Sequence, residues 1–276
     1  MNTELKKELQ NFATQIRIGC CKEIKARGFG HLSGSLSIAD ALAVLYGKEM
    51  KYDPKNPRWE DRDWFVLSKG HAGPALYATL ALKGFFDEKE LLTLNRPGTI
   101  LPSHPDRNKT PGVDISTGSL GQGISLAMGV ATGLKAQGKP NRVYCIVGDG
   151  ESNEGQVWEA ILYANQRKLD NVVVLYDYNK KQLDGYTKDV CDMGDVKAKF
   201  ESFGWNTYEI DGHDIEAIDD ALQKAKQVKG KPTAIVMNTI KGKGVTYLEE
   251  MMMNHHINVT DEQMDGAIAE LTAKLV

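Results

Sequence analysis

The amino-acid sequence predicts an α/β fold: a doubly wound, mostly parallel sheet with helices on both faces. Short apolar runs rich in β-branched residues alternate with helical stretches along the later chain. These runs lack the polar alternation of half-exposed strands, as expected for strands buried on both faces. No repeat, low-complexity tract or Pro/Ser-rich linker divides the chain. We therefore expect a single domain covering residues 1–276, with a ligand site beyond the carboxyl ends of the strands.

The individual elements follow from periodicity. The first expected helix has apolar residues at spacings of three and four, namely Leu5, Leu9, Phe12, Ile16, Cys20 and Ile24, and Gly28 to Gly30 end it. A second helix is expected from Ser37, as its N-cap, to Tyr46. The expected strands are Trp64–Leu67, Val143–Val147, Val172–Tyr176, Thr207–Ile210 and Thr233–Met237. The expected later helices are Leu120–Ala136, Gly155–Arg167, Val196–Phe203, Ile215–Val228 and Glu262–Leu275.

Composition excludes several classes of protein. The 276 residues include 34 Lys plus Arg and 37 Asp plus Glu, and this net charge of −3 argues against a nucleic-acid or membrane-surface binder. No apolar run approaches the roughly 18–20 residues of a membrane span, and the charged N-terminus does not resemble a signal peptide. The four cysteines, Cys20, Cys21, Cys145 and Cys191, show no CxxC spacing. We expect buried free thiols and a cytoplasmic location.

The strongest chemical signal stands at the ends of two expected neighbouring strands. Gly148-Asp149-Gly150 follows the strand Val143–Val147, and Asn179 follows the next strand. Because parallel strands end side by side, Asp149 and Asn179 could meet and offer oxygen ligands to a hard divalent ion. Mg²⁺ completes its shell with phosphate oxygens and water, so the pair predicts a metal-bridged diphosphate. The alternative is structural: Asp149 caps the helix that starts near Gly155, and Asn179 makes a turn.

The same residues resemble the thiamine-diphosphate signature, and further motifs resemble transketolases in order along essentially the whole chain. These motifs are Gly30-His31-Leu32-Ser33-Gly34, Leu67-Ser68-Lys69-Gly70-His71-Ala72, Leu101-Pro102-Ser103-His104-Pro105, the run Asp114 to Gly123, and Gly148-Asp149-Gly150 with Glu151 to Gly155. The runs Thr239 to Gly244 and Asn254-His255 match more weakly. One departure is that the usual Asn-Asn pair is Tyr178-Asn179 here. The family's metal-binding second Asn is present.

The resemblance implies a cofactor site for thiamine diphosphate with Mg²⁺, or with Ca²⁺ or Mn²⁺. Asp149 and Asn179 would bind the metal through their side chains, and Lys181 would bind it through its backbone carbonyl. The residues implied to contact the cofactor itself are Gly150 and Glu151 along the diphosphate, His71 at a diphosphate oxygen, and Gly118 and Leu120 at the aminopyrimidine. Neither the run Gly118–Gly123 nor Lys241–Gly244 has the spacing of a dinucleotide or P-loop motif.

The resemblance also implies catalytic side chains. His31, His104 and His255 lie in Gly- or Pro-flanked loops and would polarise the oxygens of a ketose and shuttle protons. The family's Trp-His-Gly is Asn254-His255-His256 here, which leaves the choice between His255 and His256 open. Glu154 would join a carboxylate relay across a subunit interface, and Glu159 would support it or remain a solvated residue; His213 is interpreted as structural.

The implied activity is the transfer of a two-carbon ketol group from a ketose to an aldose, often as sugar phosphates, through a thiamine diphosphate carbanion. The resemblance covers only the diphosphate-binding domain. The pyrimidine-binding domain is therefore expected on a partner chain, in an α2β2 assembly that alone is active. Three alternatives stay open: the α subunit of a 2-oxo acid dehydrogenase, another thiamine-dependent lyase or synthase, or a non-catalytic cofactor-holding subunit. The sequence does not select among pentose phosphates and branched or sulfonated sugars.

Overall fold

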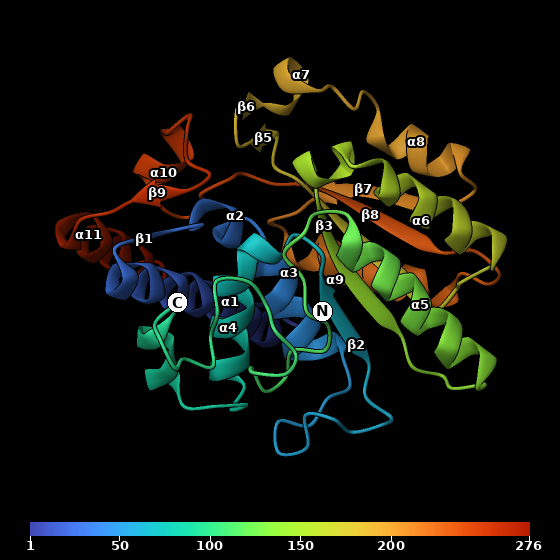
Figure 1. Cartoon of the computed structure of the whole chain (residues 1–276), viewed down its shortest axis with the longest axis horizontal. Helices are drawn as coiled ribbons and strands as arrows, with labels where there is room; N and C mark the ends of the chain where they lie inside the picture. Colours follow the sequence, from blue (N-terminus) through green and yellow to red (C-terminus); the bar gives the residue numbers. More distant parts are fainter.

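The central feature of the structure, a computed structural model that describes residues 1–276, is a five-stranded parallel sheet. Its strand order is β2-β3-β4-β8-β7, and every neighbouring pair is parallel (Figure 1). The strands are β2 (Trp64–Leu67), β3 (Val143–Gly148), β4 (Val172–Tyr178), β7 (Asn206–Asp211) and β8 (Thr233–Asn238). The predicted fold class is confirmed, and all five predicted strands are present within two residues of their expected bounds.

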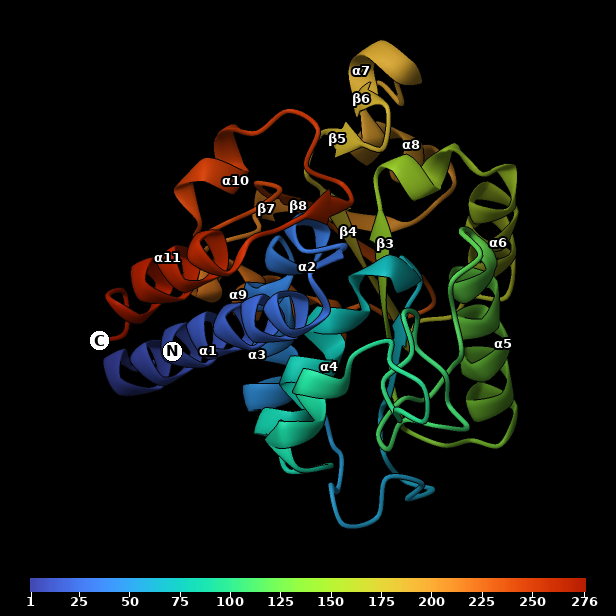
Figure 2. The same ribbon diagram turned by 60° about the vertical axis from the view of Figure 1, so that its left-hand side comes forward.

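Helices cover both faces of this sheet, as Figure 2 shows with the sheet nearly on edge. One face packs on α5 (Gln122–Ala136), α6 (Gly155–Gln166) and α8 (Val196–Ser202). The other packs on α1 (Thr3–Arg27), α3 (Ala39–Val44), α4 (Gly73–Leu82) and α9 (Ile215–Gln227). Side chains of β3 and β4 alternate between the two cores: Tyr144 and Ile146 belong to one, and Cys145 and Val147 to the other.

The C-terminal segment returns across α1 and fixes two loops against each other. Helix α11 (Asp261–Thr272) packs on α1, and β9 (Ile257–Asn258) pairs antiparallel with β1 (Phe29–Gly30). In this short ladder Gly30 is opposite Ile257. The residues that directly follow β1 and directly precede β9 are therefore held side by side, although more than 200 positions separate them.

The remaining elements are short and lie mostly within the loops that connect the longer helices and strands. They are α2 (Ser33–Leu36), a π turn (Leu45–Glu49), 3-10 turns at Gly70–Ala72, Glu88–Thr93 and Gly150–Asn153, β5 (Lys181–Gln182), β6 (Gly185–Tyr186), α7 (Thr187–Val190) and α10 (Thr246–Glu250). The β5–β6–α7 segment projects beyond the carboxyl ends of the strands (Figures 1 and 2). None of the helices is both long and apolar enough to cross a lipid bilayer.

Three local expectations were wrong. Ser37 is not the N-cap of a helix, because a separate short helix α2 precedes it and its hydroxyl bonds Gly34 O and Asp177 Oδ2. Strand β7 is only partly buried, because it forms the edge of the sheet. Cys191 is exposed, whereas Cys20, Cys21 and Cys145 are buried free thiols. Helix α4 was not predicted, since its almost uniformly apolar sequence has no amphipathic period.

Candidate functional site

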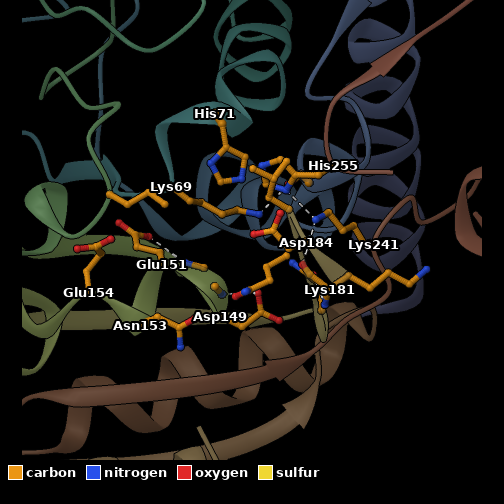
Figure 3. Close-up of a pocket in the computed structure, with 17 residues that line it drawn as sticks. Lys69, His71, Asp149, Glu151, Asn153, Glu154, Lys181, Asp184, Lys241 and His255 are labelled. Atoms are coloured by element: carbon orange, nitrogen blue, oxygen red, sulfur yellow. Dashed lines mark hydrogen bonds between the residues drawn. The ribbon is translucent and has the colours of Figure 1, made fainter. Parts of the chain in front are cut away.

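A cavity of about 350 Å³ lies at the carboxyl ends of β3 and β4. Gly148 at the end of β3 is in register with Asp177 on β4, so the polar residues that follow each strand lie side by side. Figure 3 shows Asp149 and Lys181 on one side of this cavity and His71 on another, with His255 and Lys241 next to each other. The lining residues are Gly34, Lys69, His71, Leu120, Gly148, Asp149, Gly150, Glu151, Asn153, Glu154, Asn179, Lys181, Gln182, Leu183, Asp184, Lys241 and His255.

Asp149 is held between the two strand ends. Its side chain accepts hydrogen bonds from the backbone N–H of Gly150 at 2.7 Å and of Lys180 at 2.5 Å. Burial, followed by the nearby charge of Asp177, raises the pKa of Asp149 to about 7. Asp149 also caps the 3-10 turn Gly150–Asn153, so the structural interpretation is correct in part, although the capped element is not α6.

Asn179 is oriented by a buried ion pair behind the cavity. Its Nδ2 donates to Asp177 Oδ2 at 2.8 Å, and the same oxygen accepts from Lys69 Nζ at 2.6 Å. Burial alone would raise the pKa of Asp177, but the Lys69 ammonium and the hydrogen bonds to the carboxylate lower it overall. The amide nitrogen of Asn179 is thus engaged with Asp177, and its Oδ1 accepts a long hydrogen bond from Lys181 N at 3.2 Å. An amide oxygen has two lone pairs, so Oδ1 keeps one for a ligand.

Lys241 is a site residue that sequence reasoning missed. Its ammonium donates to the backbone carbonyl of Lys181 at 3.0 Å and lies 2.9 Å from Nδ1 of His255. Burial lowers the pKa of Lys241 to about 8, against the opposing charge of Asp149. The run Thr239 to Gly244, which contains Lys241, matches the transketolase motifs only weakly, and no role was assigned to Lys241 from it. Lys241 reaches the site because the turn after β8 brings it against the Lys181 carbonyl, a contact that sequence spacing does not reveal.

Glu151 holds loops together. Its carboxylate accepts from Ser68 Oγ and from the backbone N–H groups of Gly121 and Gly148. Although Glu151 lines the cavity, its carboxylate is thus committed to the protein. Leu120 is 37% exposed and reaches the cavity, whereas Gly118 does not line it. Gly118 packs directly on the ring of His104: a Cβ added at Gly118 would lie 3.3 Å from the Cγ of His104.

Five of the six histidines gather at one end of the cavity. The ring of His31 lies 5.4 Å from that of His71, 6.1 Å from His104, 5.3 Å from His255 and 4.7 Å from His256. The structure thus brings together all the histidines predicted to act, and both His255 and His256 belong to the cluster. His255 faces the cavity beside His71, at 4.8 Å between ring centres. His256 is exposed, and its ring also lies 5.6 Å from that of Phe29.

Burial favours the neutral form of four of the clustered histidines, His31, His71, His104 and His255, by lowering the pKa of each. Burial, then the neighbouring His256, lowers the pKa of His31 to about 4. Burial, then Lys241, lowers the pKa of His255 to about 3, and burial lowers the pKa of His71 and His104 as well. Neutral imidazoles can both donate and accept hydrogen bonds.

The remaining predicted residues lie at the edge of the site or outside it. Glu154 lines the cavity and is exposed, and Glu159 is exposed on α6. His213 is engaged elsewhere: its Nδ1 bonds Asp40 at 2.8 Å, and its Nε2 accepts from Ile240 N. The structural interpretation of His213 is thus confirmed.

The donors at the strand ends fit a diphosphate-bound metal better than a metal held by protein alone. No group of three or more His, Cys, Asp or Glu side chains is arranged to hold a metal ion anywhere in the chain. Asp149, Asn179 and the Lys181 carbonyl are all oxygen donors, the type that Mg²⁺ prefers, and such sites are completed by phosphate and water. Lys241 on the cavity wall, which has no carboxylate partner, suits an anionic group.

Comparisons with known proteins agree with this geometry. The family described as "Transketolase, thiamine diphosphate binding domain" matches residues 9–272. The 6-deoxy-6-sulfo-D-fructose transketolase subunit of Clostridium sp. (strain MSTE9) is 50% identical over 96% of both chains. An apulose-4-phosphate transketolase subunit of Actinobacillus succinogenes is 38% identical over 88% of this chain and 87% of its own.

Solved structures agree as well. The transketolase of Campylobacter jejuni superposes with a TM-score of 0.90 at 34% identity, and the match covers 99% of this chain but 43% of that longer chain. These findings favour a transketolase over the 2-oxo acid dehydrogenase and non-catalytic alternatives. The chain therefore belongs to the transketolase family of ketol-group transferases, as a subunit that carries the thiamine-diphosphate-binding domain.

Proposed function

We propose that the cavity binds thiamine diphosphate together with a divalent metal, for which Mg²⁺ is the first candidate. The histidine cluster beside the cavity would bind the ketose. The observation that carries this proposal is that Asp149, Asn179 and Lys181 line one cavity beyond the ends of β3 and β4, together with His71 and His255 of the histidine cluster. The metal would bind these three oxygens, and His71 and Lys241 would face the diphosphate. When bound, the cofactor supplies a nucleophilic carbon that can accept a two-carbon ketol unit.

The chain's own residues would orient the sugar and move its protons. His31, His104 and His255 are neutral, so each can donate one hydrogen bond to a sugar oxygen and accept a proton from a hydroxyl. The lowered pKa values of His31 and His255 make these residues weak bases in the free site, which suits transient proton transfer. Gly118 would keep His104 in place, because the ring rests on its backbone.

We further propose that a partner chain with a pyrimidine-binding domain covers the cavity mouth, in an α2β2 assembly. Apolar side chains are exposed near this cavity: Leu183, which lines it, is 57% exposed on the β5–β6 turn, and Met253, two residues before His255 in the sequence, is 58% exposed. A second apolar surface lies on α5 and α6, where Leu126, Leu162 and Tyr163 are exposed. Two separate apolar surfaces fit an assembly with two kinds of interface. Exposed Glu154, at the start of α6, could reach another subunit.

The cofactor site is tested by Asp149→Asn, which keeps the shape of the side chain but removes its charge. In the assembled enzyme, titration of thiamine diphosphate in the presence of Mg²⁺ should show an affinity at least about tenfold weaker. Asp192→Asn is the matched control, because Asp192 is exposed and bonds only Gly194 N. Near-normal affinity in Asp149→Asn would refute the proposed metal site.

The need for a partner is tested by activity with and without it. The chain alone, supplied with thiamine diphosphate and Mg²⁺, should transfer no ketol unit, and co-expression with a pyrimidine-domain chain should restore transfer. Mass measurement of the complex should give two copies of each chain. Full turnover by this chain alone would overturn the proposed partner.

A further inference from the structure

The turn that follows β8, at residues 239–244, carries Lys241 to the wall of the cavity. There the Lys241 ammonium donates to the carbonyl oxygen of Lys181 and lies beside Nδ1 of His255 (Figure 3). Two glycines give this turn left-handed backbone conformations. A flexible ammonium on a glycine-containing turn reaches a fixed place only if other parts of the chain hold the turn.

His213, in the loop between β7 and α9, holds the start of this turn. Its Nε2 accepts a hydrogen bond of 2.8 Å from the backbone N–H of Ile240, the residue before Lys241. Because Nε2 accepts, the ring proton lies on Nδ1, which donates to Asp40 Oδ2 at 2.8 Å. The ring therefore connects the turn to α3, with one nitrogen committed to each side.

Asp40 is itself fixed by Arg17 of α1. The two terminal nitrogens of the guanidinium bond the two carboxylate oxygens, and its Nε donates to the Leu36 carbonyl at 3.2 Å. Burial alone would raise the pKa of Asp40, but Arg17 and the bond to His213 lower it overall, so the carboxylate stays an acceptor. Arg17 also lies against the end of the turn, since a Cβ added at Gly244 would be 3.3 Å from its Cδ.

Arg17, Asp40 and His213 do not line the cavity, so an effect that they have on it passes through the turn. A separate backbone contact, from Gly242 N to the Ser33 carbonyl at 3.0 Å, holds the middle of the turn. Loss of the His213 contact would therefore loosen the turn without detaching it.

We propose that His213 is a positioning residue for Lys241. By fixing the backbone before Lys241, the ring holds the ammonium beside the Lys181 carbonyl, ready for the diphosphate of the cofactor. A cation that is already in place binds an anion more tightly, because binding then costs no ordering of a long side chain. This inference rests on the proposed function and deepens it, because it assigns part of the cofactor affinity to residues outside the cavity.

The test uses two substitutions that separate the two bonds of the ring. In His213→Asn the shorter amide can still bond Asp40 but cannot reach Ile240 N, whereas in His213→Gln the amide oxygen extends to the place of Nε2 and can accept from it. Calorimetric titration of thiamine diphosphate into the assembled enzyme, at saturating Mg²⁺, measures affinity without turnover. Loss of one neutral hydrogen bond predicts an affinity about threefold to tenfold weaker in His213→Asn, and His213→Gln should stay within about twofold of the wild type.

A double-mutant cycle shows whether His213 acts through Lys241. Lys241→Met should itself weaken binding, because it removes the cation from the cavity wall. If the effect of His213 passes through that cation, adding His213→Asn to Lys241→Met should change the affinity by less than about twofold. Asp214→Ala is the matched control: it removes the N-cap of α9 from the same loop but leaves the bond between His213 and Ile240, so affinity should not change.

The outcomes separate this inference from the proposed function. Wild-type affinity in His213→Asn, no recovery in His213→Gln, or an equal loss in the Lys241→Met background would overturn the positioning role. A loss in Asp214→Ala as large as that in His213→Asn would also overturn it, because a general loosening of the loop would then explain both. Lys241→Met with wild-type affinity would instead contradict the proposed contact between Lys241 and the diphosphate. A wild-type assembly that binds no thiamine diphosphate would overturn the proposed function itself.

Discussion

Substituting Lys69 by methionine would test how the chain keeps a carboxylate fully buried behind the cavity. Lys69 and Asp177 are 1% and 0% exposed, and their side chains form an ion pair of 2.6 Å. In Lys69→Met, Asp177 would retain hydrogen bonds from Ser37, Asn179 and Thr239 but lose its counter-charge. Removing one partner of such a pair costs about 3–5 kcal/mol, because the other charge stays buried and uncompensated.

Urea unfolding measures this loss directly. A loss of about 3–5 kcal/mol corresponds to a fall in Tm on the order of 10 °C for a domain of this size. Adding Asp177→Asn to Lys69→Met removes the stranded charge and should restore at least half of the lost free energy of unfolding. Lys139→Met is the control, because its pair with Glu60 is 3.6 Å long and Glu60 is exposed. A loss below about 1 kcal/mol for Lys69→Met, or a double variant no more stable than the single one, would refute the reasoning.

Three further predictions concern burial, backbone contact and protonation. Glu23 is fully buried without a hydrogen-bond partner, and burial raises its pKa well above 4.5. The folded state keeps this proton and the unfolded state releases it, so stability falls as pH rises above 4.5. Glu23→Gln should therefore add about 1–3 kcal/mol at pH 8 and less at pH 5, measured by urea unfolding. Gly70→Ala should lower both stability and kcat. The added Cβ would lie 2.7 Å from the backbone nitrogen of Gly118, and Gly118 is the residue on which the His104 ring packs. With fructose as donor and with thiamine diphosphate and Mg²⁺ saturating, so that Asp149 stays ionised on the metal, kcat/KM should show no acid limb near pH 6.5, because the pKa values of His31 and His255 are lowered to about 4 and 3.

Each of these predictions has a contrary result. Equal stabilisation by Glu23→Gln at pH 5 and pH 8 would mean that Glu23 is not protonated in the folded state. Gly70→Ala with wild-type stability and kcat would show that the loop carrying Gly118 can move at no cost. An acid limb at pH 6.5 that disappears in His31→Asn would show that His31 titrates at its ordinary value.

Much of the site could be predicted from the sequence because its elements are local. The run Val143 to Gly150 is apolar and ends at a glycine-flanked carboxylate, which marks a buried strand and its tip wherever the strand lies. The next strand ends in Asn179, and parallel pairing of neighbours follows from the α/β pattern alone. The amphipathic period of α1 and α9 likewise needs no tertiary context. Helix α4 was missed for the complementary reason: a helix buried on every side has no polar face to reveal its period.

What the sequence by itself determined was the doubly wound α/β class, the strand tips that hold Asp149 and Asn179, and the family. Only the tertiary structure decided the rest. The β1–β9 ladder brings His31 beside His255 and His256, and the turn after β8 places Lys241 on the Lys181 carbonyl. These contacts join residues up to 225 positions apart, and such closures are selected by packing of the whole chain rather than by local propensity.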